Sequence, residues 1–337
     1  MTSLLDVEDL AVTIPVRSPV LRRRIASIHA LRGVSFSVSA GETLALVGES
    51  GSGKSTAARA IVRLVQATHG SISFNGQSVL EARGSVLHAI RRNLQIVFQD
   101  PYSSLNRRMS VGDIIGEPLR AHTVGDAASR RRRVGELLAQ VGLDASAFVQ
   151  YPVAFSGGQR QRIAIARALA LSPRLVVCDE AVSALDVSIQ AQILNLLQDL
   201  KRIYGLAYLF ITHDLGVVRR FADRVAVMHA GRIVEIATPE ALFAGALHPY
   251  THSLLSAIPR ISIGEPLPAR IRLVSPAPSP MSTPAGCLFV KRCAYAVARC
   301  GAEAPAMRTQ PDGRQVACHL VEKGQPMWVS AARSIKE

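Results

Sequence analysis

The chain has 337 residues, enough for one large α/β domain and an appendage of modest size. Hydrophobic residues make up 48% of it and aromatic residues only 5%, which indicates a sizeable core. The formal net charge of +14 comes from arginine clusters at residues 22–24, 91–92, 107–108 and 130–133. A nucleic-acid surface is one interpretation. Because no aromatic stacking residues are interleaved with the arginines, we favour solvated helix faces that attract anionic lipid and nucleotide.

The sequence also argues against secretion and against membrane insertion. Residues 1–10 contain three acidic residues and no basic region typical of a signal peptide. The longest charge-free stretch, residues 273–290, contains four prolines and cannot span a bilayer as a helix. Five cysteines in such a chain suggest a reducing compartment. We therefore expect a soluble, cytosolic protein.

The first clear strand, residues 43–47, leads directly into a glycine-rich loop, residues 48–55. The loop fits G-x-x-x-x-G-K-[ST], whose glycines let backbone N–H groups turn toward phosphate oxygens. Helical spacing follows from Lys54, and this strand–loop–helix context argues against a chance match. We expect Lys54 to reach the β- and γ-phosphates and the Ser55 hydroxyl to hold Mg²⁺. The predicted nucleotide-binding residues here are Gly48, Glu49, Ser50, Gly51, Ser52, Gly53, Lys54, Ser55 and Thr56.

Further strands of the same body are predicted at residues 72–74 and 94–98, and Gln99 ends the second of them. From about residue 100 to residue 172, apolar positions recur at helical spacing. We interpret this stretch as a mostly helical subdomain inserted into the sheet. A helix within it is predicted from about Gln159, directly after Ser156, Gly157 and Gly158.

Two carboxylates, Asp179 and Glu180, follow a buried apolar strand at residues 175–178. Such a pair can simply cap a strand end. Beside a phosphate-binding loop we favour a functional interpretation, in which Asp179 contacts Mg²⁺ directly or through water. Glu180 then polarises the attacking water.

A helix is predicted from about Val187 to a stop at Gly205, and buried strands follow at residues 206–211 and 225–228. Strands that alternate with helices indicate an α/β fold with a mainly parallel sheet. His213 follows the strand at 206–211, as Gln99 follows the strand at 94–98. Alone, neither residue is informative. Open α/β sheets bind ligands at the carboxyl ends of their strands, which makes both residues candidates.

After Pro259 the core pattern ends, and residues 260–337 are predicted to form a separate tail. The tail holds Cys287, Cys293, Cys300 and Cys318 but lacks the Cys-x-x-Cys pair of an ordinary zinc ribbon. Four thiolates can ligate a [4Fe–4S] cluster, so the cluster, Zn²⁺ and unligated thiols are all kept as alternatives. The neighbouring His319 is expected to support a ligand at most. Cys178 is expected to be a small core residue.

Taken in order, the loop 48–55, Gln99, the segment 156–159, Asp179-Glu180, the segment 183–186 and His213 resemble the ATP-binding cassette of ABC transporters. The resemblance covers roughly residues 5–260. It implies a P-loop NTPase cassette at residues 1–259 with a mainly parallel core sheet and an inserted α-helical subdomain (about 100–172). Residues 260–337 are then a small cysteine-bearing C-terminal extension.

In this family two cassettes form a head-to-tail dimer, and each ATP lies between the loop of one subunit and the signature segment of the other. The resemblance implies ATP and Mg²⁺ as cofactors and Glu180 and His213 as catalytic residues. The further nucleotide-binding residues implied are Gln99, Ser156, Gly157, Gly158, Gln159 and Asp186, and the Mg²⁺ ligands implied are Ser55, Gln99 and Asp179.

Some segments indicate a narrower family within the ABC transporters. They are residues 98–106, 155–162 and 248–251 and the tail around Cys287 and Cys293, and they look like the corresponding segments of dipeptide and oligopeptide importers. The chain is most similar to their second ATPase subunit type, and this favours the [4Fe–4S] cluster over Zn²⁺. The implied partners are a related second ATPase subunit, two membrane permease subunits and an extracytoplasmic peptide-binding protein, with this chain peripheral on the cytoplasmic face of the membrane. No nucleic acid is expected as a partner.

Other functions remain as alternatives. The cargo can be a nickel chelate, a glutathione-like molecule or an oligosaccharide, since the cassette does not touch it. An exporter ATPase, or a soluble ABC ATPase acting on nucleic acid or the ribosome, is a more distant alternative.

The sequence departs from the family pattern at three places. Ile14 stands where an aromatic ring usually stacks on adenine, so apolar contact with the base is expected to be weaker. Ala181 stands where proline is usual after Glu180. Arg107 and Arg108 follow Asn106 where proline is common, on the surface expected to receive the permease's coupling helix.

Overall fold

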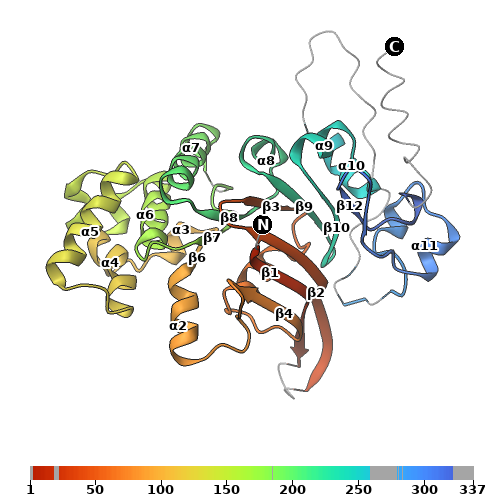
Figure 1. Ribbon diagram of the computed structural model, residues 1–337, viewed down its shortest axis with the longest axis horizontal. Coiled ribbons are helices and arrows are strands. Elements are labelled where there is room, and N and C mark those ends of the chain that lie inside the picture. The colour runs from red at the N-terminus through yellow and green to blue at the C-terminus, as the bar shows by residue number, and fades with distance from the viewer. Residues whose placement is uncertain are drawn as a thin grey trace, which may run out of the picture.

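The computed structural model describes residues 3–18, 23–183, 185–258, 279, 281–282 and 284–321. Within these residues the main sheet has the strand order β11-β12-β10-β9-β3-β8-β7-β6 (Figure 1). The run from β9 to β6 pairs in parallel, which confirms the predicted α/β fold with a mainly parallel sheet. The strands are β3 (Thr43–Val47), β6 (Leu94–Val97), β7 (Leu175–Asp179), β8 (Ala207–Thr212), β9 (Arg224–His229), β10 (Arg232–Ala237), β11 (Arg308–Thr309) and β12 (Gln315–Val316).

The central strands are continuous apolar runs because both faces of the main sheet are covered. All residues of β3, β7 and β8 are buried. In Figure 1 the helices α7 (Val187–Tyr204), α8 (Leu215–Phe221) and α9 (Pro239–Ala244) lie above this sheet. A second sheet lies below it. Strands buried on both faces lose the alternating pattern of a half-exposed strand, which is why their sequence reads as short hydrophobic blocks.

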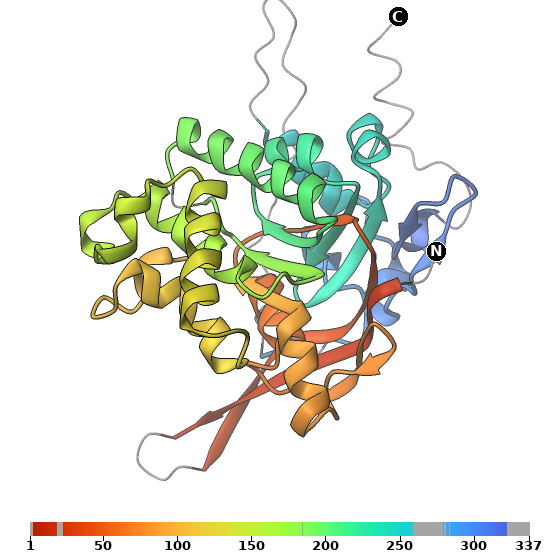
Figure 2. The same ribbon diagram turned by 60° about the vertical axis from the view of Figure 1, so that its left-hand side comes forward.

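The second sheet is antiparallel and has the order β2-β1-β4-β5. Its strands are β1 (Ser3–Arg17), β2 (Arg24–Ser39), β4 (His69–Phe74) and β5 (Gln77–Ser78). Strand β4 contains the predicted strand 72–74, but it pairs with β1 and not with the parallel strands. Figure 2 shows β1 and β2 as a long hairpin that extends beyond the rest of the sheet. Helix α1 (Lys54–Ile61) packs in the core between the two sheets.

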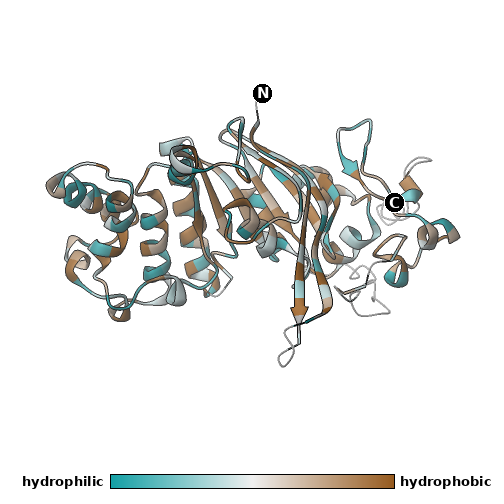
Figure 3. Cartoon of the chain, turned by 90° about the horizontal axis from the view of Figure 1, so that it is seen from below, coloured by the Kyte–Doolittle hydropathy of each residue, from teal (hydrophilic) through white to brown (hydrophobic). Residues whose placement is uncertain are grey.

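The stretch between β6 and β7 is helical, which confirms the predicted inserted subdomain. A separate core cluster joins its helices to α7 through residues such as Ile115, Leu137 and Ile163, all fully or almost fully buried. Figure 3 shows mixed hydrophobic and hydrophilic residues on these helices and mainly hydrophobic residues on the central strands. The elements are α3 (Pro101–Ser104), α4 (Val111–Ala121), α5 (Ala127–Gln140), η1 (Ala145–Val149), η2 (Pro152–Ala154) and α6 (Gly157–Leu169), preceded by α2 (Gly84–Asn93) before β6.

Residues 284–321, the described part of the predicted cysteine-bearing extension, continue the main sheet. Strand β12 pairs antiparallel with β10 through Val316 and Glu235, and β11 pairs with β12. Around it lie α10 (Pro249–Ser256), η3 (Val290–Arg292), α11 (Ala298–Ala302) and η4 (His319–Val321). Most of residues 259–283 and all of residues 322–337 lie outside the described residues, as does Ala184. In the part of the chain that the structure describes, no helix is both long and apolar enough to cross a bilayer.

Helix α7 ends where the sequence predicts. Gly205 follows it in the left-handed region, with φ 61°, and its N–H donates to the carbonyl of Lys201. A side chain at Gly205 meets no atom within 4 Å, so the backbone conformation alone selects glycine there.

Gly205→Ala should therefore lower the free energy of unfolding by about 1 kcal/mol, the cost of a left-handed alanine. The matched control is Gly135→Ala inside α5, where a Cβ also meets nothing within 4 Å but the backbone is helical. That change should stabilise the protein by up to about 1 kcal/mol. Urea denaturation followed by circular dichroism compares the two, and equal effects would refute the backbone explanation.

Candidate nucleotide site

The loop between β3 and α1 is held against the main sheet by its backbone. A Cβ on Gly48 would lie 2.1 Å from the carbonyl oxygen of Met228 at the end of β9, so no side chain fits. Gly53 precedes α1 with φ 107°, and the N–H of Gly231 donates to the Ser52 carbonyl at 2.8 Å. The loop therefore takes the strained turn that places backbone N–H groups at the start of a helix, which suits an anion.

Lys54 is turned into this loop and is 4% exposed. Its Nζ donates to the carbonyl oxygens of Gly48 and Glu49, at 2.9 and 3.0 Å, and lies 4.0 Å from a carboxylate oxygen of Glu180. Burial lowers the pKa of Lys54, while the charges of Glu180 and Asp179 act in the opposite direction. The ammonium group thus joins the loop to the carboxylates that follow β7.

Ser55 and Asp179, the two predicted Mg²⁺ ligands, place their side-chain oxygens side by side. The Ser55 hydroxyl donates to Asp179 Oδ1 at 2.7 Å. Within the described chain, Asp179 Oδ2 and Ser52 Oγ are buried and have no hydrogen-bond partner. Burial raises the pKa of Asp179, and the bond from Ser55 lowers it. Buried oxygens without partners beside a phosphate-type loop fit a hydrated magnesium ion, which prefers oxygen ligands.

Glu180 follows β7, and it contacts the polar residues that follow the two neighbouring strands. Its carboxylate accepts a hydrogen bond from Gln99 Nε2 at 2.8 Å, after β6, and lies 3.6 Å from His213 Nδ1, after β8. Its own backbone is left-handed, with φ 47°, and its N–H donates to the Ile211 carbonyl at 3.0 Å. An acid residue in this conformation is costly, and such positions cluster at functional sites. The structure therefore brings together the residues that the sequence placed at three separate strand ends.

The segment 156–159 lies at the start of α6 and is not part of this group. Ser156 and Gln159 form a capping box: the Ser156 hydroxyl accepts from the Gln159 N–H at 3.3 Å, and the Gln159 side chain accepts from the Ser156 N–H at 2.9 Å. Ser156 and Gly157 are exposed. Among the described residues, no hydrogen bond or ion pair links this segment to Lys54, Asp179 or Glu180.

Gly158 and Asp186 lie where the helical subdomain meets α7. A Cβ on Gly158 would lie 2.5 Å from a side-chain carbon of Ile189, so the helices approach closely there. Asp186 precedes α7 without a side-chain capping bond. Of the remaining predicted residues, Ser50 is exposed, Gly51 is left-handed with φ 78°, and Thr56 lies in the first turn of α1.

Comparison with known proteins agrees with this arrangement. The ABC transporter family matches residues 31–183, and the oligopeptide/dipeptide transporter C-terminal region matches residues 234–300. The oligopeptide transport ATP-binding protein AppF of Bacillus subtilis is 46% identical over 94% of this chain and 97% of its own length. The chain belongs to the ATP-binding proteins of ABC transporters. It is an ATPase of the ABC type.

Two other proteins show how far the likeness extends. The di/tripeptide transport ATP-binding protein DppF of Pseudomonas aeruginosa is 49% identical over 88% of this chain and 92% of its own length. The ATP-binding cassette MJ0796, solved as a dimer in a post-hydrolysis state with ADP and Pi, has a TM-score of 0.62 at 28% identity. That structure covers 70% of this chain and 98% of its own, so the cassette fold is shared.

In this ABC ATPase the cysteines of the extension meet at one small cavity of about 20 Å³, lined also by His319. Burial raises the pKa of Cys287 and Cys293 and raises that of Cys318 to about 12, with the other cysteine thiolates adding to the effect at Cys318. Such a volume holds about one water molecule. Among the described residues, no group of three or more His, Cys, Asp or Glu side chains is arranged to hold a metal ion. Cys178 is fully buried in β7, as a core residue should be.

Sequence reasoning did not find the residues that fasten the phosphate loop to the extension. Arg292 forms two hydrogen bonds to the Glu49 carboxylate, and the Tyr250 hydroxyl accepts from the Glu49 N–H at 2.9 Å. Glu49 was expected in the binding loop, but Arg292 and Tyr250 served only as markers of the subfamily. These contacts are made across more than 200 positions of sequence, so no local spacing could have revealed them.

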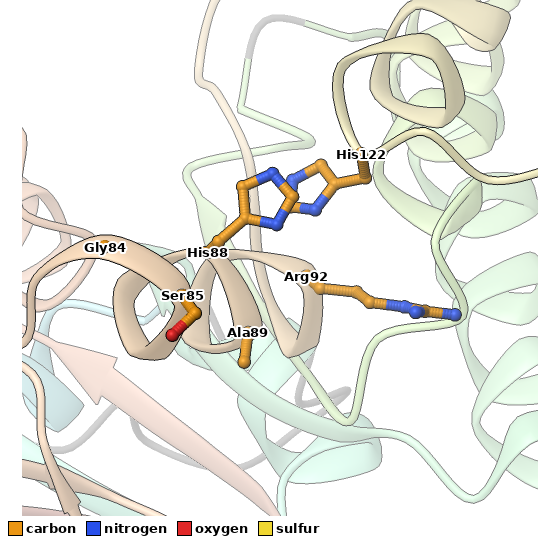
Figure 4. A pocket seen from close by; sticks show the side chains of 6 residues that line it. All are labelled: Gly84, Ser85, His88, Ala89, Arg92 and His122. Atoms are coloured by element: carbon orange, nitrogen blue, oxygen red, sulfur yellow. The ribbon is translucent and has the colours of Figure 1, made fainter.

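A second hollow, of about 470 Å³, lies between α2 and the end of α4 (Figure 4). The rings of His88 and His122 stack there with centroids 3.9 Å apart. Burial lowers the pKa of His122, and the nearby His88 and Arg92 add to that effect. Figure 4 shows two imidazole rings, a guanidinium group and a hydroxyl around this hollow, and none of its six lining residues is a carboxylate, which separates it from the chemistry at Glu180. It is lined by Gly84, Ser85, His88, Ala89, Arg92 and His122.

Ile14 is the residue that the family resemblance places beside adenine. Ile14 lies on β1 opposite Ile28 of β2 and is 42% exposed, so an apolar side chain is offered to solvent where the family carries an aromatic ring.

Ile14→Tyr should tighten ATP binding several-fold, since stacking on a ring contributes about 0.5–1.5 kcal/mol beyond buried area. Calorimetry gives the dissociation constants of ATP, GTP and pyrophosphate. The affinity for ATP should increase more than the affinity for pyrophosphate, which has no base. Ile25→Tyr is a matched control because Ile25 is also exposed on this hairpin. No change in ATP affinity would mean that another group contacts adenine.

Proposed function

We propose that this chain is the ATP-hydrolysing subunit of an ABC importer for dipeptides or oligopeptides, working as a head-to-tail dimer on two permease subunits. The observation that carries the proposal is the convergence of Gln99, His213 and Lys54 on the carboxylate of Glu180. The peptide assignment is supported by the match of residues 234–300 to the C-terminal region of peptide transporters.

ATP would enter against the loop of residues 48–55. The backbone N–H groups of the loop and the start of α1 bind phosphate oxygens, and Lys54 exchanges its two carbonyl partners for the β- and γ-phosphates. The exchange is favourable because a phosphate oxygen is charged and a carbonyl is not, so the new bonds are charge-assisted on both sides. Thr56 and Ser52 lie in the same turn and extend the cradle.

Mg²⁺ would be held by Ser55, by Asp179 directly or through water, and by Gln99. When bound, it neutralises charge on the β- and γ-phosphates. The buried Asp179 Oδ2, which lacks a partner among the described residues, supports this assignment. Gln99 now donates to Glu180, so in this role its amide oxygen would face the ion while its nitrogen keeps hold of the carboxylate.

Glu180 would accept the proton of the attacking water. Gln99 and His213 orient its carboxylate from two sides, and its left-handed backbone fixes the direction of its side chain. A positioned general base contributes about 10²–10⁴-fold to a rate. His213, at 3.6 Å from Glu180 Oε2, is close enough to reach a γ-phosphate that binds beside that carboxylate.

Ser156, Gly157, Gly158 and Gln159 would close on the ATP of the partner cassette. The N–H groups at the start of α6 present a positive helix end, which favours the γ-phosphate. Asp186, beside the contact of Gly158 with α7, would face the same interface. This proposal explains why the segment has no partner among Lys54, Asp179 and Glu180 of its own subunit.

The remaining partners follow from the same role. We place the chain peripherally on the cytoplasmic face of the membrane, with a related second ATPase subunit, two permeases and an extracytoplasmic peptide-binding protein. The permease contact would use the segment after Gln99, where Arg107 lies 3.6 Å over the Tyr102 ring. Arg107 is thereby held in place, and its charge gives this surface a preference for acidic or aromatic side chains.

Glu180→Gln should reduce ATP turnover about 100-fold or more while leaving ATP binding within about twofold, because only the base is lost. ATP should then hold the closed dimer, which light scattering detects as a doubled mass. Glu240→Gln removes an exposed carboxylate from the first turn of α9 and is the control. Normal turnover in Glu180→Gln would remove Glu180 from the mechanism.

We also propose that Cys287, Cys293, Cys300 and Cys318 hold a metal centre, a [4Fe–4S] cluster or alternatively Zn²⁺. Support comes from the four thiols that line one cavity, since thiolates are the ligands both groups prefer, although in the described residues these side chains are not arranged to hold a metal ion. At about 20 Å³ the cavity is small for a cluster, so the segments that carry the thiols would have to move apart on loading. His319 donates a hydrogen bond from Nε2 to the Glu303 carbonyl at 3.0 Å and stays outside the proposed ligand set.

Cys293→Ser should abolish bound iron or zinc in protein purified without oxygen, measured by elemental analysis and by absorption near 400 nm. Cys178→Ala, which changes the one cysteine outside the cavity, should keep the metal. Unmodified protein that carries neither metal would contradict the proposal, whatever the variants show.

A further inference from the structure

An ion pair between the buried Arg292 and the partly exposed Glu49 joins the phosphate loop to the cysteine-bearing extension. Arg292 lies at the end of η3, is 8% exposed, and grips Glu49 with both terminal nitrogens, at 2.9 and 2.8 Å. Glu49 lies between Gly48 and Ser50 inside the loop. Two parallel bonds between a guanidinium and a carboxylate fix orientation as well as charge.

The charge of Glu49 is a difficulty for a triphosphate site. The bonds from Arg292 lower the pKa of Glu49, so its carboxylate is ionised at neutral pH. An unpaired carboxylate in the loop would repel the phosphates of ATP and attract Lys54 away from them. Arg292 neutralises this charge through its two bonds to the carboxylate, while Lys54 holds the Glu49 carbonyl at 3.0 Å.

Packed rings hold Arg292 in place. Phe289 lies against Tyr250 and His229, with ring centroids 5.5 and 5.4 Å apart, and Arg292 lies 5.8 Å over the Phe289 ring. The Tyr250 hydroxyl in turn accepts a hydrogen bond from the Glu49 N–H. Glu49 is therefore fixed at its side chain by the extension and at its backbone by α10.

The segment that carries Arg292 also lines the cysteine cavity. Phe289, Val290 and Cys293 are lining residues, and Arg292 lies between the last two. A change in the spacing of the thiols would move the turn from which Arg292 reaches Glu49. The cavity and the phosphate loop are thus separated by one short turn of chain.

We propose that Arg292 is a positioning residue for ATP binding: through Glu49 it neutralises and orients the phosphate loop, so that ATP affinity depends on the segment 287–293 of the extension. The proposal rests on the ATPase role given above. It adds that the extension acts on the nucleotide site of its own chain.

The first test is the split between KM and kcat. Arg292→Ala should raise the KM for ATP about tenfold and leave kcat within about twofold, since a charge-assisted pair of this kind corresponds to roughly that factor. Arg292→Lys keeps the charge but not the two parallel bonds, so its KM for ATP should lie between those of the unmodified protein and Arg292→Ala. Arg299→Ala is the matched control, because Arg299 pairs with Glu303 within the extension at 2.9 Å.

A double variant separates electrostatics from folding. Glu49→Gln added to Arg292→Ala removes the charge that Arg292 had neutralised, and the KM should return to within about threefold of the unmodified value. A merely structural pair would leave the double variant as impaired as Arg292→Ala. That result, or an unchanged KM in Arg292→Ala, would overturn the proposal.

The second test uses reciprocity, since the coupling of two sites acts equally in both directions. MgATP should slow amide hydrogen exchange in residues 287–293 of the unmodified protein and should not do so in Arg292→Ala. Equal protection in both proteins would overturn the inference. Absence of ATP hydrolysis by the unmodified protein with its partner cassette would instead overturn the ATPase role, so the two failures are distinct.

Discussion

The parallel register of β6, β7 and β8 is the constraint on which the nucleotide site depends. Val97 pairs with Cys178, and Asp179 pairs with Ile211, so the three strands end at nearly the same level. The residues that follow the three strand ends must then meet at one edge of the sheet, and this brings the side chains of Gln99, Glu180 and His213 into contact. A shift of a single residue in any pair would turn one of these side chains to the other face of the sheet.

Backbone conformations that are costly elsewhere are concentrated at this edge. Gly48 lies against a carbonyl where no Cβ fits, and Glu180 is left-handed although it carries a side chain. Folding tolerates both because the sheet beneath is buried on both faces and cannot relax. The site is therefore preorganised: its carboxylate and its phosphate-binding N–H groups are in place before nucleotide enters.

The helical subdomain and the extension act on this edge from different directions. Ser156 of the subdomain is exposed and, among the described residues, makes no hydrogen bond to its own chain's Lys54, which suits the proposed site completed by a second cassette. The extension reaches the same chain's loop through Arg292, and it continues the main sheet through β12. A region that the sequence suggests is a separate tail thus contributes both to the core and to the nucleotide loop.

The sequence by itself determined the α/β class, the phosphate-binding loop and the candidate residues Asp179, Glu180 and Lys54. The reason is physical: a loop that wraps phosphate must be contiguous, and a buried strand ending in acids is a local pattern. Tertiary structure alone decided that β4 joins a separate antiparallel sheet, that four distant thiols share a cavity, and that Arg292 holds Glu49 across 243 positions. Contacts between such distant segments depend on how whole elements pack against each other, and the local sequence pattern of neither segment predicts them.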